Sequence, residues 1–131
     1  MERSDDELIG RVRGRAVGRV QFRRDVPRRR FVNQPSGYVS PEMVRLTLAT
    51  ASEFGRPLCD GWDYVVNSTG LLIPDIRNVR FLAEIPKLPN LNRYIIVAPN
   101  PIVRAMANGL RLVSHPDQVC RSMGEIADSS S

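Results

Sequence analysis

The sequence contains few of the residues that thiol, histidine or metal chemistry requires. Its 131 residues include two cysteines and one histidine. Cys59 and Cys120 lie far apart and neither belongs to a C-x-x-C spacing, so we expect two reduced thiols rather than zinc ligands or a redox pair. No phosphate-binding glycine motif, nucleophile elbow or histidine pair is present. The sequence therefore predicts no catalytic residue, no metal site and no cofactor, and an enzyme is the least favoured class.

Long apolar runs are also absent. No run approaches the roughly 20 residues of a transmembrane helix, and residues 1–8 are acidic, unlike the basic start of a secretory signal. We therefore expect a cytoplasmic protein without a membrane span. The length and the hydrophobic content of 42% fit one domain with one core. Residues 1–14 have few apolar positions and mixed charges, which predicts a flexible leader before a single domain over residues 15–128.

Lysine is nearly absent: the sequence has 18 arginines and one lysine, Lys87. The net charge of +5 comes from residues 1–30, which hold ten arginines and five acidic residues, whereas residues 31–131 hold nine residues of each sign. Clustered guanidinium groups pair well with phosphates and carboxylates, so the outward face of the first strands predicts an electrostatic patch. Its members are Arg19, Arg23, Arg28, Arg29 and Arg30.

A general preference for arginine over lysine explains the same excess without any partner. The base-stacking aromatic residues of nucleic-acid readers are not interleaved with these arginines. We therefore expect any binding of nucleic acid through this patch to be weak, unspecific and steeply dependent on salt.

What the sequence does contain is a regular alternation of strand and helix patterns. Residues 16–23 alternate apolar and polar positions, and after a turn the pattern resumes at residues 28–34, which predicts an antiparallel hairpin. Further strands are predicted at residues 62–66, 94–98 and 118–120, parallel to one another. The fold class is therefore α/β, with a mixed sheet that combines an N-terminal antiparallel hairpin with parallel strands and is flanked by helices.

Helix starts are marked by a polar residue before a proline. Ser40 before Pro41 predicts a helix that ends at Gly55, and Asn100 begins a helix that runs to Pro116. Between them, Pro74 and Asp75 predict a helix that Pro86 ends, and the spacing of Ser122 and Glu125 is that of a capping box before a short terminal helix. Each predicted helix thus follows a predicted strand.

Two segments carry a resemblance to a known family. They are the helix entry Gly37–Glu42 (GYVSPE) and the strand, loop and helix entry Tyr64–Asp75 (YVVNSTGLLIPD). Both resemble the STAS fold of anti-sigma-factor antagonists and the related SpoIIAA-like family. The resemblance extends over residues 15–128. It implies a regulatory module that binds proteins, with a kinase-type regulator or a sigma-factor regulator as the partner.

In regulatory members of that family, a kinase phosphorylates a serine directly after an aspartate at the second helix entry. Here Asp75 is followed by Ile76, and the strand-end aspartate of the family is Asn67. Isoleucine cannot accept a phosphate, so we expect a module that phosphorylation does not gate. Ser68 and Thr69 are the nearby hydroxyls, and we expect them to cap local backbone groups.

We expect the partner to bind where the carboxyl ends of the parallel strands meet, because ligands of open α/β sheets gather at that edge. The loop from Asn67 to Asp75 and the loop from Pro99 to Arg104 should be neighbours there. The candidate partner-binding residues are Asn67, Ser68, Thr69, Asp75, Ile76, Arg77, Asn100 and Arg104. Ordinary loop packing accounts for the same pattern equally well.

Two further functions and a homodimer stay open at this stage. SpoIIAA-like domains resemble carriers of the CRAL-TRIO type, so a small ligand or lipid carrier is an alternative, and the arginine patch permits a binder of nucleic acid or of an acidic surface. A closed apolar cavity would favour the carrier, and a strong salt dependence would favour the electrostatic binder.

Overall fold

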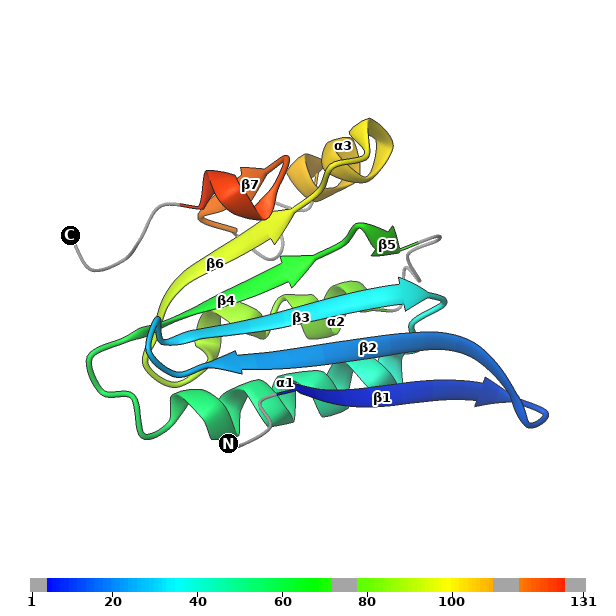
Figure 1. Cartoon of the computed structure of the whole chain (residues 1–131), viewed down its shortest axis with the longest axis horizontal. Coiled ribbons are helices and arrows are strands. Elements are labelled where there is room, and N and C mark those ends of the chain that lie inside the picture. Colours follow the sequence, from blue (N-terminus) through cyan, green and yellow to red (C-terminus); the bar gives the residue numbers. More distant parts are fainter. Residues whose placement is uncertain (1–4, 72–77, 110–115, 127–131) are drawn as a thin grey trace.

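The structure, a computed structural model, describes residues 5–71, 78–109 and 116–126 (Figure 1). In these ranges the strands form one mixed sheet in the order β1-β2-β3-β4-β6-β7, with β5 beside β3. The strands are β1 (Asp5–Val12), β2 (Arg15–Asp25), β3 (Arg30–Gly37), β4 (Trp62–Asn67), β5 (Gly70–Leu71), β6 (Leu91–Val97) and β7 (Gln118–Cys120). The helices are α1 (Pro41–Gly55), α2 (Val79–Leu82) and α3 (Pro101–Gly109), with short 3-10 turns η2 (Ile85–Lys87) and η3 (Met123–Glu125).

The sheet changes from antiparallel to parallel pairing at β3. The β1–β2 and β2–β3 pairs are antiparallel, whereas β3, β4, β6 and β7 run parallel to one another. This confirms the predicted α/β class, the hairpin and the parallel arrangement of the three later strands. β3 continues through Pro35 to Gly37, and β6 begins at Leu91, so both strands are longer than predicted.

The predicted leader over residues 1–14 was wrong for Asp5–Val12, which form β1. An edge strand receives its hydrogen bonds from the backbone of its neighbour, so it needs few apolar side chains to form. Leu8 packs against the core, and Gly10 lies so close to α1 that a Cβ there would be 2.6 Å from Sδ of Met43. The charged composition of this segment therefore concealed a strand in which Leu8 packs against the core.

The helices begin at their predicted caps. The amide of Met43 donates to Ser40 Oγ at 3.3 Å, and the amide of Ile102 donates to Asn100 Oδ1 at 2.8 Å. At the terminal turn, Ser122 makes no side-chain cap, so the predicted capping box is absent. Instead, Glu125 Oε1 accepts a hydrogen bond of 3.1 Å from the amide of Arg121.

The structure differs more from the prediction at the second predicted helix. Its predicted start at Pro74 and Asp75 lies outside the described residues. The described part is a short α2 followed by η2. Pro86 was predicted to end the helix, but it lies inside η2. The predicted end of the third helix, up to Pro116, crosses residues 110–115, which the structure does not describe.

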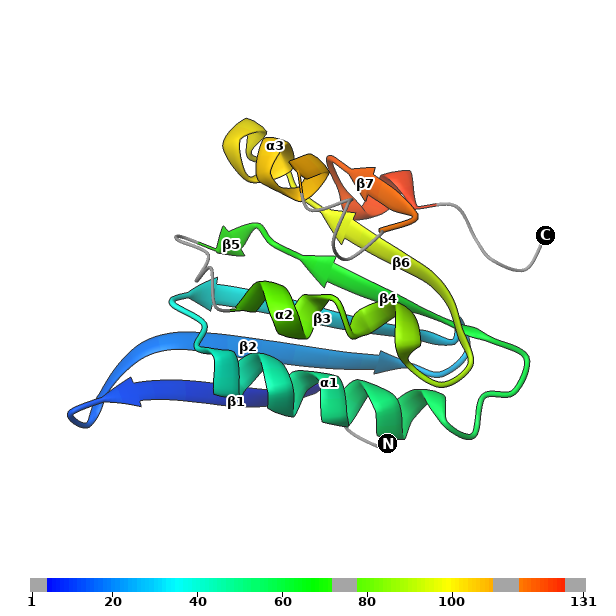
Figure 2. The same ribbon diagram turned by 180° about the vertical axis from the view of Figure 1, so that it is seen from behind.

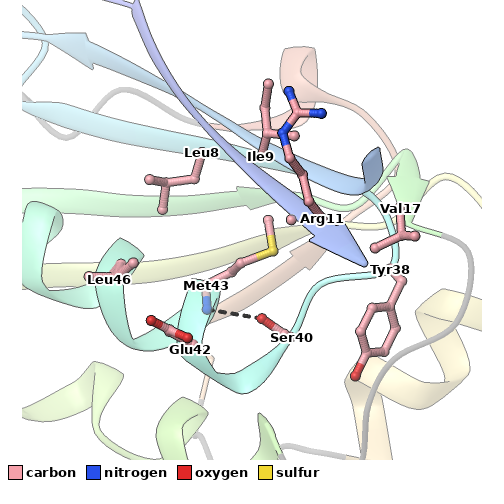
Figure 3. Close-up of a pocket in the computed structure, with 10 residues that line it drawn as sticks. Leu8, Ile9, Arg11, Val17, Tyr38, Ser40, Glu42, Met43 and Leu46 are labelled. Atoms are coloured by element: carbon pink, nitrogen blue, oxygen red, sulfur yellow. Dashed lines mark hydrogen bonds between the residues drawn. The ribbon is translucent and has the colours of Figure 1, made fainter. Parts of the chain in front are cut away.

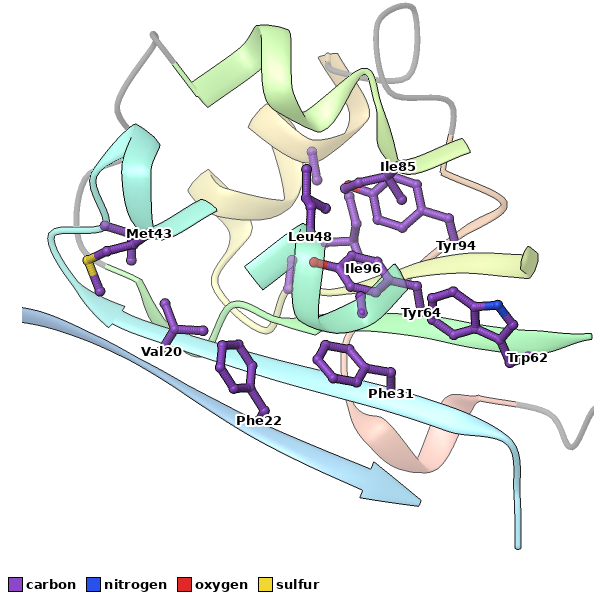
Figure 4. Close-up of a cluster of buried hydrophobic side chains, with 14 residues drawn as sticks. Val20, Phe22, Phe31, Met43, Leu48, Trp62, Tyr64, Ile85, Tyr94 and Ile96 are labelled. Carbon is purple, nitrogen blue, oxygen red and sulfur yellow. The ribbon is translucent and has the colours of Figure 1, made fainter. Parts of the chain in front are cut away.

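The main core lies between the sheet and the helices α1 and α2, which cover the same face (Figure 2). Aromatic rings of neighbouring strands contact one another through it: Phe31 lies 5.9 Å from Tyr64, and Tyr64 lies 5.9 Å from Tyr94, measured between ring centroids (Figure 4). Asn33 Nδ2 donates to Tyr64 Oη inside this core. Burial raises the pKa of Tyr64 above its usual range, so its hydroxyl stays protonated and accepts this bond as a neutral phenol.

Within residues 5–71, 78–109 and 116–126, the opposite face of the sheet is covered over the later strands only. Met123 and Ile126 of the C-terminal segment pack there on a second buried cluster, which consists of Val65, Ile95, Val97 and Cys120. Over β2 the outward positions are exposed, and they include Arg19, Gln21 and Arg23. Antiparallel strands often leave one face to solvent in this way. We call this uncovered part, over β1–β3, the open face.

Three glycines lie side by side across β1, β2 and β3. Gly10 is paired with Gly18, and Gly18 is paired with Gly37. The chain passes directly over this row when it leaves β3 for α1, because a Cβ on Gly18 would lie 1.6 Å from the carbonyl oxygen of Tyr38. Gly37 begins that passage with a φ of +68°, a conformation that favours glycine. The row therefore allows the first turn of α1 to reach the sheet.

Candidate functional site

The carboxyl ends of β4 and β6 lie side by side, as predicted for the candidate site. Asn67 is paired with Val97, and the Ser68 amide donates to the Val97 carbonyl at 2.9 Å. Ser68 Oγ donates to the same carbonyl oxygen at 2.7 Å. The loops that follow the two strands are therefore neighbours.

Within this edge, Ser68 is not exposed to a partner. Its exposed fraction is 4%, and its hydroxyl is bonded to the Val97 carbonyl. The structure therefore corrects its assignment as a partner-binding residue and agrees with its expected local role. Thr69 is exposed, and its amide and hydroxyl both donate to Asn67 Oδ1, so a side-chain turn holds this loop.

The second loop is held by Asn100 and Arg104. Asn100 caps α3, and one guanidinium nitrogen of Arg104 donates to the carbonyl oxygens of Ala98 and Pro99 at 3.2 and 3.3 Å. Arg104 therefore fixes the loop from within. Asp75, Ile76 and Arg77, the other predicted partner-binding residues, lie outside the described residues.

Ile102 is the feature of this edge that the sequence did not reveal. It is 72% exposed in the first turn of α3. Among the side chains of α3 that the structure describes, Ala107 is the buried one, more than one turn later. Near its start, α3 therefore presents a large apolar side chain beside two loops that hydrogen bonds keep in place. The spacing of apolar residues along a helix does not show which of them lie beyond the edge of the core.

The arginines of the predicted patch have different surroundings. On the open face, Arg19 lies 3.4 Å from the Glu7 carboxylate, and Arg28, at the turn after β2, lies 3.0 Å from that of Asp25. Arg23 is exposed on β2, and Arg29 adopts a φ of +51° in the turn before β3. Nearby carboxylates therefore offset part of the positive charge that the sequence predicted.

Arg30 belongs to a row of alternating charges across four strands rather than to a free patch. The paired residues are Asp25, Arg30, Asp63 and Arg93, on β2, β3, β4 and β6. Arg30 Nε is buried and has no hydrogen-bond partner among the described residues. Arg30 is half-buried, so the structure corrects its place among the exposed arginines.

The centre of this row is a buried ion pair. Asp63 is 0% exposed, and its carboxylate accepts hydrogen bonds from Arg93 at 2.6 and 3.2 Å. The spacing of residues in the sequence did not reveal this pair. Its geometry, two nitrogens of one guanidinium on two carboxylate oxygens, is that of a structural contact, and it is not open to a ligand.

The two thiols should react differently, and a reagent can show it. Cys59 is exposed, whereas Cys120 is 1% exposed. Burial and, to a smaller extent, the Glu125 carboxylate raise the pKa of the Cys120 thiol, and the thiolate is the reactive form. We expect iodoacetamide to modify Cys59 in the folded protein and Cys120 only in urea, as measured by mass spectrometry. Equal labelling in the folded protein would contradict the buried position.

A small pocket of about 260 Å³ opens between β1 and the start of α1 (Figure 3). Leu8, Val17, Tyr38, Met43 and Leu46 line it, together with the hydroxyl-bearing Ser40. Pockets for drug-sized ligands begin at about 300 Å³ and enclose most of the ligand. This pocket is smaller and lies at the edge of the sheet, so it does not have the form expected of a lipid carrier.

The described part of the chain contains no helix with the length and apolar character needed to cross a membrane. The same residues include no group of three or more His, Cys, Asp or Glu side chains arranged to hold a metal ion. Comparison of the chain with protein-family models, with curated proteins and with solved structures yields no match.

Proposed function

We propose that this chain is a non-catalytic protein-binding module of the STAS or SpoIIAA-like kind, and that its partner binds the carboxyl edge of β4 and β6. The observation that supports this most is Ile102, whose side chain is 72% exposed at that edge. Interfaces combine a few apolar anchors with a polar rim, and Thr69 and Asn100 supply exposed polar groups here.

The two loops at the carboxyl edge of β4 and β6 are also preorganised. They are fixed by the bonds of Ser68 to Val97 and of Arg104 to Ala98, so a partner would order few groups on contact. Binding loses less entropy when the contact residues are already held in place. The proposed partner class is a kinase-type regulator or a sigma-factor regulator, as the resemblance implies.

We propose that phosphorylation does not gate this contact. Ile76 stands where the phosphorylated serine of the family would be. The hydroxyl of Ser68 is buried and already donates to a carbonyl oxygen, so a kinase would have to open the loop to reach it. A constitutive module fits these residues better than a switched one.

The test is an Ile102→Asp variant. The tagged full chain captures proteins from its host, and the affinity of the purified partner is then measured by calorimetry. We expect the variant to bind about thirtyfold more weakly, because a buried apolar anchor contributes about 2 kcal/mol. An aspartate in the first turn of a helix is favourable, so the fold should be retained.

Val26→Asp is the matched control, since Val26 is 60% exposed in the turn between β2 and β3, at the other end of the parallel strands. We expect this control to bind like the unaltered chain. Equal binding by the Ile102→Asp variant, or equal loss in both variants, would contradict the proposed edge. Recovery of nucleic acid alone would contradict the protein-binding function.

The alternatives have weaker support. For an electrostatic binder, Arg19 and Arg28 already have carboxylate partners, and Arg30 is half-buried. For a carrier, the pocket beside β1 is small and opens at the sheet edge. Neither observation favours a phosphate-rich or a lipid partner over a protein.

A further inference from the structure

β1 is the long edge of the sheet. The strand order places β1 at one end and β7 at the other (Figure 1). β7 has three residues and is followed by η3, whereas β1 has eight residues and pairs with β2 along one side. Among the described residues no strand pairs with its other side. An edge of this length presents a row of backbone donors and acceptors to which another strand can bind.

Exposed apolar side chains are concentrated at this edge. The large apolar residues that are exposed among the described residues are Ile9, Val17, Val26, Leu46 and Ile102. Three of these five, Ile9, Val17 and Leu46, line the pocket at β1. In Figure 3, Leu8 lies on the side of β1 toward Leu46, whereas Ile9 extends from the other side. Both faces of the edge therefore offer apolar surface, as interaction sites do.

The charge order along β1 indicates which strand fits. The strand begins with three acidic residues, and Arg11 is near its end. Beside a parallel copy, like charges would face one another, but beside an antiparallel copy acidic residues face arginine. The extra residue of the β1–β2 bulge is Val17 of β2, so β1 itself keeps a regular alternation of side chains.

We propose that two copies of this chain pair through β1, antiparallel, about a two-fold axis at Ile9. In this register Ile9 faces Ile9 of the other copy, and Glu7 faces Arg11 in both directions. Glu7 contacts Arg19 through Oε2 at 3.4 Å, which leaves its Oε1 for the Arg11 guanidinium of the second copy. The two sheets then form one continuous sheet. The Glu7 and Arg11 charges favour a second copy of β1 over a strand that lacks the complementary charges.

Disulfide trapping tests the register directly. In a Cys59→Ser background, we expect an Ile9→Cys variant to form an intermolecular disulfide with itself under mild oxidation, because opposed residues of antiparallel strands have Cα atoms about 4.5–5.5 Å apart. A Glu7→Cys variant should not cross-link alone but should do so when mixed with an Arg11→Cys variant. Val26→Cys, in the distant turn, is the control that should stay uncross-linked.

Sedimentation of the full chain provides the second measurement. We expect a dimer whose dissociation constant rises at least about tenfold in Ile9→Lys and in Glu7→Arg, because like charges then meet at the axis or across it. Combining Glu7→Arg with Arg11→Glu should restore the dimer, and Val26→Lys should leave it unchanged. Circular dichroism confirms that each variant is folded. A monomeric unaltered chain, or a dimer insensitive to these charges, would overturn the proposal.

Discussion

Replacing Arg93 with alanine is expected to lower the free energy of unfolding by about 3 kcal/mol. The change leaves the Asp63 carboxylate, which is 0% exposed, without its partner, and such a loss costs about 3–5 kcal/mol. The lower end of that range applies because the Arg93 side chain keeps 21% exposure, so solvent already weakens the pair. Urea unfolding followed by the fluorescence of Trp62, the one tryptophan and a buried one, measures the effect.

Two further variants show that the cost comes from the unpaired carboxylate. Arg45→Ala removes an exposed arginine of α1 and should change stability by less than about 0.5 kcal/mol. Changing both partners, Asp63→Leu with Arg93→Met, should cost less than Arg93→Ala alone, since neither member of the pair then remains as an unpaired buried charge. If the double variant were the least stable of the three, the ion pair itself would be the stabilising element.

Replacing Gly18 with alanine is expected to destabilise the protein by at least about 3 kcal/mol. A Cβ at this position would lie 1.6 Å from the carbonyl oxygen of Tyr38 and 2.9 Å from its amide nitrogen. The obstacle is backbone rather than a flexible side chain, so the entry into α1 must move, which puts the cost at or above the usual range for overpacking. Urea unfolding and the yield of soluble protein measure the loss.

Gly109→Ala is the matched control for this substitution. Nothing lies within 4 Å of a Cβ built on Gly109, at the end of α3. Alanine favours a helix over glycine by up to about 1 kcal/mol, so we expect unchanged or slightly higher stability. A Gly18→Ala protein as stable as the control would show that the chain between β3 and α1 can shift without cost.

The elements that could be predicted are those with strong local signals. Ser40 with Pro41 predicted the start of α1, and Asn100 predicted the start of α3. Each signal is local, because a capping side chain bonds to an amide within the first turn of its helix. β1 could not be predicted in this way. Its residues gain their stability from the backbone of β2, and Leu8 is the one apolar side chain of β1 that packs against the core among those the structure describes.

The candidate site was predictable in outline only. That the ends of β4 and β6 meet follows from parallel pairing, and the Asn67–Val97 register confirms it. The burial of Ser68 depends on a carbonyl about 30 residues later in the chain, and the Asp63–Arg93 pair on the register of two separate strands. Such contacts have no signature in the spacing of residues along one segment.

The order of the strands along the main path of the sheet is also their order along the chain. Each strand of this path therefore joins the growing edge of the sheet, and the two antiparallel pairings, β1 with β2 and β2 with β3, close the shortest loops. During synthesis, β1, β2 and β3 can pair before α1 is complete. Met123 and Ile126, which pack on Val65, Ile95 and Val97, are made after the strands that carry these three residues. A nascent chain that ends before residue 118 would therefore leave Val65, Ile95 and Val97 without these two packing partners.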